Sequence, residues 1–531
     1  MHHTKCARLQ KYVIAPSFAT KLRSEIGDQF YSLVADESTN EANVSCLALC
    51  IRFYSTCKKS VVDTFYRLVP LEDATANTLY QTVKRCLTED GLDVKKMIGL
   101  GTDGASYMIG RTHSLSTLLR VDNPELTLIK CVCHSLHLAA SKASDCLPTI
   151  IDFLVRETHN WFSNSPKRTN EYQAIYKVLE NSVPKKVPGM SGTRWLARLE
   201  AVNVIIDQWE ALKLHFELSA SKERCHTTRT LHDAYRDDQN KLYLLFVRKT
   251  LKEVVRVNKI FQAQAADITK VTQDLVAMYR NLMNIVVNPK HLSKCSDENL
   301  PKLKFLDHVM PCEAMNFGYE FNTFAVACSL TKVQVQYVKE RCKEFVIELI
   351  NQVQMRLPDN VETLLMLKNF HPSIATSQIK DSVAQIGARY RSTFEDLDGL
   401  ENEWSSIGLQ QWPKSCLGNL ISFWTEVNEK ENSAGEKLFS NISSLVLSLL
   451  SLPFSNATVE RIFSQMNVVH SKPRNRLNVR SVEALLQIRY GLIHYFQSCV
   501  NFEPSDDMIR NFNSKGTAEE EEDNIIALDV Q

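Results

Sequence analysis

The sequence lacks an excess of charge of either sign. Its 531 residues carry 62 Lys and Arg against 61 Asp and Glu, which gives a formal net charge of +1. A protein that holds nucleic acid through its overall field needs a clear basic excess, so this mode of binding is excluded. Any contact with DNA must come from local basic patches or from a module that this sequence does not contain.

Long hydrophobic runs are missing as well. A helix that spans a bilayer needs roughly 20 consecutive apolar residues, and no stretch approaches that length. The first residues, which include His2, His3 and Lys5, lack the pattern of a secretory signal. No internal repeat of fixed period is present. We therefore expect a soluble protein with no membrane partner.

Cysteine is not scarce, but nothing in the sequence favours disulfides. Many of the 15 cysteines, such as Cys46 and Cys50, lie in apolar runs, where a free thiol behaves as a small hydrophobic residue. A reducing compartment, the cytosol or the nucleus, is the better interpretation. Cys131 and His134 have metal-ligand spacing, yet no second pair at finger spacing follows, so no structural zinc is expected.

Strand and helix patterns alternate over the first 133 residues. We expect strands at 30–35, 45–54, 61–69, 97–100 and 126–133, and helices at 17–26, 76–88 and 114–120. Short polar connections predict that the first three strands form an antiparallel meander. The order of three strands, helix, strand, helix and strand is typical of the first half of an RNase H-like α/β domain, whose sheet gathers carboxylates at its strand ends.

Helical periodicity dominates from about residue 134 to 450, with long amphipathic stretches at 199–218, 242–257, 268–287 and 333–356. We predict a lead-in helix in 1–28, the first part of an RNase H-like core in 29–163, a helical insertion domain in 164–440, the second part of the core with a dimerisation region in 441–498, and an acidic, disordered tail in 499–531.

Three acidic residues occupy positions from which they could share metal ions. Asp36 and Asp103 each end an apolar strand, on what would be adjacent central strands, and Glu460 lies at the start of a helix after Ser455. Carboxylates so placed bind divalent cations, which activate a water or a 3′-hydroxyl for phosphodiester chemistry. The alternative is that the aspartates are ordinary turn residues and Glu460 faces solvent.

Two other segments carry candidate contacts with nucleic acid. Trp195 beside Arg194 combines a ring that can stack on an unpaired base with a cation for phosphate, although a core tryptophan is the favoured alternative. A basic turn in 470–477 supplies Lys472, Arg474 and Arg476. His134 could contact a scissile phosphate or position a water, or it could equally be a satisfied core histidine.

Five motifs in register resemble the hAT superfamily of DNA transposases. They are Val34-Ala-Asp36-Glu-Ser-Thr, Gly101-Thr-Asp103-Gly-Ala, Cys131-x-x-His134, Arg194-Trp195 and Asn456-Ala-Thr-Val-Glu460-Arg-Ile-Phe-Ser464, within about residues 17–495. The resemblance implies an α/β plus α protein, an RNase H-like mixed-sheet catalytic core interrupted by a large all-helical insertion domain. It implies Asp36, Asp103 and Glu460 as an acidic triad for two Mg²⁺ or Mn²⁺ ions, with His134 near the active site and Trp195 stacking on a flipped base.

The same resemblance implies partners and a location. DNA, as transposon ends or genomic DNA, would be the substrate, with no small-molecule substrate and a nuclear location. The C-terminal region would mediate self-association, for which we expect Phe463, Leu477, Leu485 and Leu486 to supply apolar contacts.

The sequence also departs from the family pattern. Val459 stands where a serine usually precedes the glutamate, and no Cys-x-x-Cys with a paired histidine, the signature of a BED-type finger, precedes Asp36. Two functions therefore stay open. One is an active transposase that cleaves and transfers DNA strands, and the other is a domesticated, non-catalytic nuclear protein that acts through C-terminal dimerisation and protein interaction.

Overall fold

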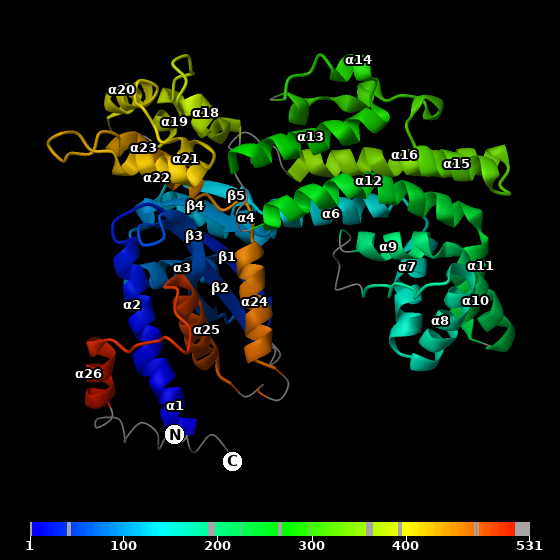
Figure 1. The fold of residues 1–531 in the computed structure, drawn as a ribbon, viewed down its shortest axis with the longest axis horizontal. Helices are drawn as coiled ribbons and strands as arrows, with labels where there is room; N and C mark the ends of the chain where they lie inside the picture. Colours follow the sequence, from blue (N-terminus) through cyan, green and yellow to red (C-terminus); the bar gives the residue numbers. More distant parts are fainter. Residues whose placement is uncertain are drawn as a thin grey trace. The chain divides into compact units, whose positions relative to one another are not determined.

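The computed structural model divides the chain into two compact units (Figure 1). The first unit combines Met1–Cys131 with Met366–Gln531, and the second is Val132–Leu365. The structure describes residues 3–39, 44–189, 196, 198–223, 225–263, 268–297, 299–356, 365–390, 396–471, 474 and 477–515. Within these ranges no helix is both long and apolar enough to cross a membrane.

One five-stranded sheet, in the order β3-β2-β1-β4-β5, forms the centre of the first unit. The strands are β1 (Tyr31–Thr39), β2 (Ser45–Ser55), β3 (Ser60–Pro70), β4 (Met97–Thr102) and β5 (Thr127–Lys130). The first three are antiparallel, whereas β4 runs parallel to both β1 and β5. The predicted meander is therefore confirmed, and the sheet is mixed.

Both faces of the sheet are buried, which explains why its strands read as nearly continuous apolar runs. Successive residues of a strand point to opposite faces, so Leu33 and Ala35 of β1 join one core and Val34 joins the other. The first face is covered by α3 (Ala76–Glu89) and α5 (Leu115–Asp122), and the second by α24 (Ala457–Val469) and α25 (Val479–His494). Helices α3, α24 and α25 are labelled in Figure 1.

Glycines in β4 allow the segment before α24 to lie directly on the sheet. A Cβ atom on Gly101 would come within 2.8 Å of Cγ of Pro453, and one on Gly99 would come within 2.7 Å of Cδ2 of Leu452 and 3.0 Å of Cδ of Pro453. Real Cβ atoms do not approach other atoms this closely, so only glycine leaves the required space. This contact holds the start of α24 against β4.

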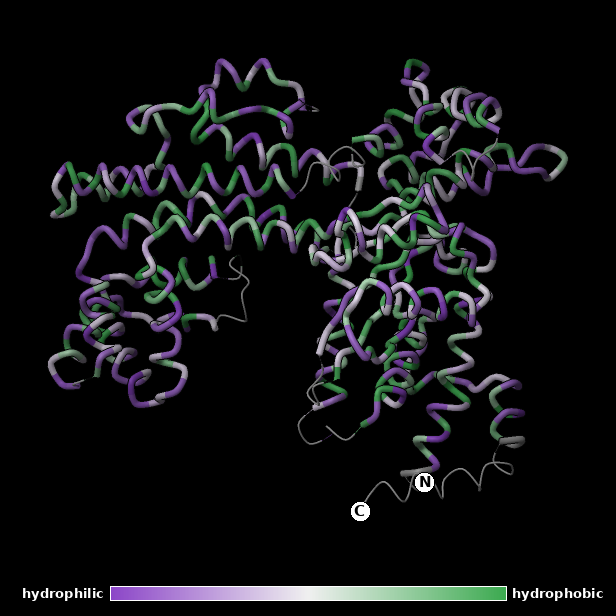
Figure 2. Tube along the Cα trace, turned by 180° about the vertical axis from the view of Figure 1, so that it is seen from behind, coloured by the Kyte–Doolittle hydropathy of each residue, from purple (hydrophilic) through white to green (hydrophobic). Residues whose placement is uncertain are grey.

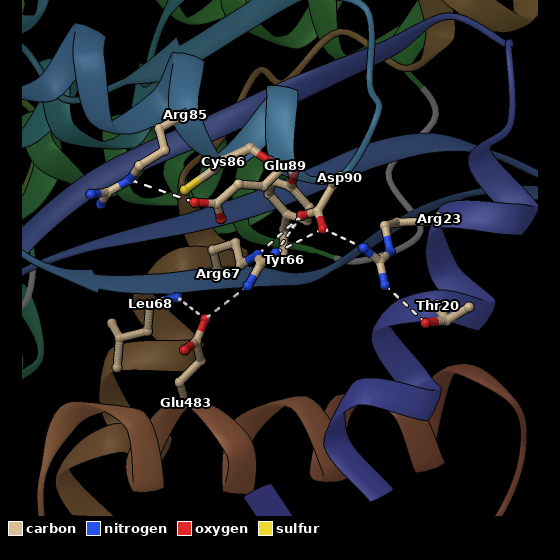
Figure 3. Close-up of polar contacts among 10 residues, drawn as sticks. All are labelled: Thr20, Arg23, Tyr66, Arg67, Leu68, Arg85, Cys86, Glu89, Asp90 and Glu483. Carbon is tan, nitrogen blue, oxygen red and sulfur yellow. Dashed lines mark hydrogen bonds and ion pairs between the residues drawn. The ribbon is translucent and has the colours of Figure 1, made fainter. Parts of the chain in front are cut away.

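A buried carboxylate joins the helices of the first unit to β3 (Figure 3). Asp90, the C-cap of α3, has a side chain that is only 2% exposed. Arg67 of β3 donates hydrogen bonds to it from Nε at 3.0 Å and from Nη2 at 2.7 Å, and Arg23 of α2 (Ala15–Ile26) donates from Nη1 at 2.8 Å. Arg67 also lies 3.9 Å from Glu483 of α25. The network therefore ties three helices to one strand.

The second unit is helical in its described residues, apart from an isolated bridge between Val287 and Val309. Its main helices are α6 (Val132–Ser144), α7 (Thr149–Ser163), α8 (Pro166–Glu180), α9 (Arg198–Asp207), α10 (Trp209–Lys222), α11 (His226–Arg236), α12 (Asp238–Gln262), α13 (Ile268–Val286), α15 (Tyr319–Ala327) and α16 (Lys332–Arg356). Figure 2 shows hydrophobic and hydrophilic residues alternating along α12 and α16. The helices predicted at 242–257, 268–287 and 333–356 are therefore present, and α6, α12 and α16 pack against one another.

Two predicted elements have different bounds in the structure. The strand expected at 126–133 ends at Lys130, because Lys130 is the last residue of β5 that pairs with β4 and α6 begins at Val132. The stretch expected as one helix at 199–218 is divided at Gln208. The buried side chain of Gln208 accepts a hydrogen bond from the hydroxyl of Tyr172 and donates one to the carbonyl of Lys185, contacts that hold this break in place.

The compact units divide the chain at other residues than the predicted domain ranges. Helices α6 and α7, expected in the core part 29–163, belong to the second unit, where α6 packs along α16. Conversely, α22 (Leu420–Glu429), expected in the insertion 164–440, contacts β3 of the first unit. In the predicted tail, Asp506–Lys515 forms α26 and buries Met508, whereas the acidic run at 519–523 lies outside the described residues.

We predict that Asp90→Asn destabilises the first unit. The change removes the charge that pairs with Arg67 and Arg23, so the free energy of unfolding should fall. We expect a decrease of about 2–4 kcal/mol, less than for a fully buried pair because both arginines are partly exposed. Denaturant unfolding monitored by intrinsic fluorescence measures it. The matched control is Glu89→Gln, which alters the neighbouring, exposed carboxylate and should leave the unfolding midpoint unchanged. Equal midpoints for all three proteins would contradict the role given to Asp90.

A second prediction concerns pH and the second unit. His215 of α10 is 1% exposed, its Nε2 accepts a hydrogen bond from Trp161 at 3.1 Å, and burial lowers its pKa to about 4. The unfolded chain therefore binds more protons between pH 6.5 and 4, so stability should fall by about 3 kcal/mol as the pH drops through this window. In His215→Gln this part of the pH dependence should be absent. Unfolding midpoints measured from pH 7 to pH 4 that run parallel in both proteins would refute the prediction.

Candidate functional site

The parallel pairing of β1 with β4 brings Asp36 and Asp103 to neighbouring positions. Val34 of β1 lies opposite Gly101 of β4. Because the strands are parallel, Asp36 and Asp103, each two residues further along, lie at about the same level. Asp36 is still within β1 and pairs with Ala48 of β2, which belongs to the core on the second face. Because residues two apart share a face, Asp36 is on the same face as Val34.

Helix α24 brings the third acidic residue to that face. Val459 and Ile462 of α24 belong to the same hydrophobic core as Val34 and Ala48. Glu460 lies between Val459 and Ile462 in the sequence, in the first turn of the helix. Its backbone N–H donates to the carbonyl of Asn456 at 3.0 Å, which starts the helix at this point. The sheet register thus sets the positions of Asp36 and Asp103, and the packing of α24 on the sheet sets the position of Glu460.

The pKa of Asp36 is shifted by the acidic groups around it. Burial, followed by the negative charge of Asp103, raises the pKa of Asp36 to about 8, and Cys131 and Glu460 raise it further. A hydrogen bond from the backbone N–H of Glu37 to Oδ1 at 3.0 Å acts in the opposite direction. Neighbouring carboxylates raise a pKa when they are close enough to repel one another. Asp36 is therefore the centre of a crowded group of acids.

Asp103 also stabilises the turn that follows β4. Its Oδ1 accepts a hydrogen bond from the backbone N–H of Ala105 at 3.1 Å, which is the turn role that aspartate often plays. This is the simpler alternative considered from the sequence, and it occupies one of the two carboxylate oxygens. The turn fixes the orientation of the carboxylate at the end of β4.

Glu37 and Tyr107 adjoin the acidic group and were not predicted. Glu37 accepts a hydrogen bond from Oγ of Ser45 at 2.6 Å. Burial and the charge of Glu37 raise the pKa of the Tyr107 phenol to about 12, with further contributions from Asp103 and from a hydrogen bond to Glu37. The sequence contained one signal, since Glu37 directly follows Asp36, but Tyr107 is placed by the turn after β4 and no spacing rule would find it.

In donor type, the group fits a hard divalent cation. Carboxylate oxygens are the ligands that Mg²⁺ and Mn²⁺ prefer, and positive charge would relieve the repulsion at Asp36. A buried amide oxygen, Oδ1 of Asn456, has no hydrogen-bond partner and stands one helical turn before Glu460. Even so, no three or more His, Cys, Asp or Glu side chains in the described ranges are arranged to hold a metal ion. The carboxylates approach one another without forming a closed ligand set.

Of the other residues predicted for catalysis or nucleic-acid contact, the structure describes only His134 and Arg474. His134 lies in the first turn of α6, in the second unit, and is partly buried. Arg474 is exposed after α24. Arg194, Trp195, Lys472 and Arg476 lie outside the described residues. The roles assigned to these residues stay predictions.

Of the four apolar residues assigned to self-association, one is fully buried and three are partly exposed. Leu486 is completely buried in the core on the second face of the sheet, and Phe463 and Leu477 pack against that core while remaining partly exposed. Leu485 is partly buried. Because α25 lies along the sheet, its helical periodicity turns Leu486 inward. The structure corrects the expectation for Leu486, which stabilises the fold and presents no surface to a partner.

We predict that Gly101→Val disturbs the site through packing alone. The added side chain would displace Pro453, so we expect a loss of stability of about 1–3 kcal/mol and a shift of α24 away from β4. Denaturant unfolding gives the first quantity, and hydrogen exchange of the amides of α24 gives the second. Gly418→Ala is the matched control, because its Cβ would meet nothing within 4 Å. Unchanged exchange in α24 for Gly101→Val would contradict the close contact.

Comparison with known families agrees with the arrangement of the first unit. Residues 5–113, which contain Asp36 and Asp103, match a family model described as the ZMYM1/FAM200 RNase-like domain. Residues 418–492, which contain Glu460, match the hAT family C-terminal dimerisation region. The second match supports self-association. Two parts of the chain are thus similar to an RNase-like domain and to the hAT C-terminal dimerisation region, and this pair of matches is consistent with a hAT-derived, transposase-like protein.

Proposed function

We propose that this protein is a metal-dependent DNA transposase, or the catalytic portion of one, acting in the nucleus on transposon ends or genomic DNA. Its first unit would be an RNase H-like core, interrupted by the helical residues 132–365 as an insertion domain. The observation that carries the proposal is the parallel pairing of β1 with β4, which brings Asp36 and Asp103 to adjacent strand ends, beside the sheet face that α24 covers. The charges of Asp103 and Glu460 both raise the pKa of Asp36. Neighbouring acids that raise one another's pKa are typical of functional sites, because the fold gains no stability from their repulsion.

In this proposal Asp36, Asp103 and Glu460 would hold Mg²⁺ or Mn²⁺. When bound, the metal would supply activation of a water or 3′-hydroxyl and stabilisation of the leaving oxygen. Backbone N–H groups fix the orientation of two of these carboxylates. The N–H of Glu37 orients Asp36, and the N–H of Ala105 orients Asp103.

Contact with DNA would come from local residues, because the chain has no overall basic charge. The candidates are those predicted from the sequence: Arg194, Trp195, Lys472, Arg474 and Arg476. Trp195 would stack on an unpaired base, and the cations would contact phosphates.

A second function is favoured by a specific observation. The described His, Cys, Asp and Glu residues form no complete metal-ligand group, whereas the match to the hAT dimerisation region is clear. A domesticated protein that self-associates and binds other proteins without cutting DNA would have these properties. Self-association measured by sedimentation, together with no cleavage under any metal condition, would favour this function.

The catalytic proposal predicts Mn²⁺-dependent nicking of DNA that carries candidate terminal repeats. Asp103→Ala should lower the rate at least about 100-fold, since changes in the second shell of a metal site already cost 10–100-fold. A gel assay of nicked product over time, with EDTA added in parallel, measures the effect.

The matched control for this assay is Asp122→Asn. Asp122 ends α5, which packs on the opposite face of the sheet, and it pairs with Lys84 at 3.0 Å. This variant should cleave like the unmodified protein. Equal background cleavage by the unmodified protein and by Asp103→Ala would refute catalysis through this site.

A further inference from the structure

Phe496, the second residue after α25, has a strained backbone. Its φ is +55°, in the left-handed region that glycine adopts freely and that a bulky side chain disfavours. The N–H of Gln497 donates to the carbonyl of Leu492 at 2.8 Å, and the N–H of Phe496 donates to the carbonyl of Ile493 at 3.3 Å. This pair of hydrogen bonds ends many helices, usually with glycine at the left-handed position. Phenylalanine is an unfavourable choice there for the fold alone.

The end of α25 is held firmly on α2, so the strain at Phe496 cannot relax. His494 donates from Nε2 to Oε2 of Glu25 at 2.8 Å, and both side chains are almost fully buried. The ring of the next residue, Tyr495, stacks on Phe18 with 6.2 Å between ring centroids. Strained residues persist where the surrounding structure fixes them in this way, and such residues are often functional.

The side chain of Phe496 is also exposed. It is 74% exposed, and Ile493 and Val500 beside it in the sequence are 56% and 92% exposed. Nζ of Lys58 lies 4.8 Å from the centroid of the ring, a contact that contributes little at an exposed site. A ring that is both strained and exposed adds little to stability. The three apolar residues, here called the α25-end patch, therefore favour contact with another protein.

The position of the α25-end patch indicates which protein this is. The match to the hAT dimerisation region ends at residue 492, within α25, and Ile493 follows directly. Among the described residues of the matched range, only Leu438 and Val468 are exposed large apolar residues, and they belong to separate segments. The other large apolar side chains there are buried or half-buried. An apolar centre for self-association is therefore better provided by the α25-end patch, which continues the matched region.

We propose that the α25-end patch binds a second copy of this chain, with Phe496 as its anchor. The inference rests on the self-association in the proposed function and does not depend on catalysis. An aromatic side chain on a fixed backbone loses little conformational freedom on binding, so the contact in the dimer offsets the strain of the free chain. Because most dimers of identical chains use the same surface on both copies, we expect the two patches to face each other.

Sedimentation of the full chain over a range of concentrations tests this contact, with Phe496→Gly as the main variant. The dissociation constant of the dimer should rise at least about 10-fold, as on truncation of an aromatic anchor. Glycine suits the left-handed backbone, so the unfolding midpoint of the monomer, measured in dilute solution, should stay the same or rise. Lys58→Gln removes the cation and keeps the ring, so it should change the dissociation constant far less.

Val121→Ser is the matched control, because Val121 is exposed on α5, which packs on the first face of the sheet. It should alter neither quantity. A lower unfolding midpoint in Phe496→Gly would mean that the ring supports the fold, and would overturn the proposal. An unchanged dissociation constant in Phe496→Gly would overturn the α25-end patch and leave self-association through another surface. A monomeric unmodified protein would overturn both, and none of these results bears on DNA cleavage.

Discussion

The contact between Pro453 and the glycines of β4 is the constraint on which the rest of the first unit depends. Because Gly99 and Gly101 have no side chains, the proline lies against the strand itself, within a distance that a Cβ atom would exclude. Helix α24 begins four residues after this proline and packs on the second face of the sheet. From this helix the charge of Glu460 acts on Asp36.

Two buried aspartates of the first unit, Asp90 and Asp36, lie in opposite electrostatic environments. Asp90 is enclosed by Arg67 and Arg23, so its charge is neutralised and joins three helices to the sheet. Asp36 has other acids as its neighbours, and its pKa rises to about 8. The first arrangement stabilises the fold, and the second costs stability unless a cation is bound. This contrast separates a structural acid from a candidate functional one without any appeal to sequence similarity.

Much of the fold followed from local patterns, and the misses have identifiable causes. The meander of β1 to β3 and the amphipathic helices α12 and α16 were predictable, because their periodicity is set by which residues are buried. The end of β5 was misjudged because Cys131 to Cys133 is as apolar as the strand before it, and apolarity alone does not distinguish a buried strand from a buried helix. Leu486 looked available to a partner because periodicity identifies an apolar side of a helix but not what covers it.

By itself, the sequence determined the three acidic positions and the type of element that carries each, since strand ends and helix starts leave local signals. Only the tertiary structure decided how these positions lie, because the register of β1 on β4 joins residues 67 apart, such as Val34 and Gly101, and the start of α24 contacts Cys131, 325 residues earlier in the chain. The structure also identified Glu37 and Tyr107 as groups that interact with the acids or with one another. Their significance lies in burial and charge, which arise when separate segments pack and which no local pattern records.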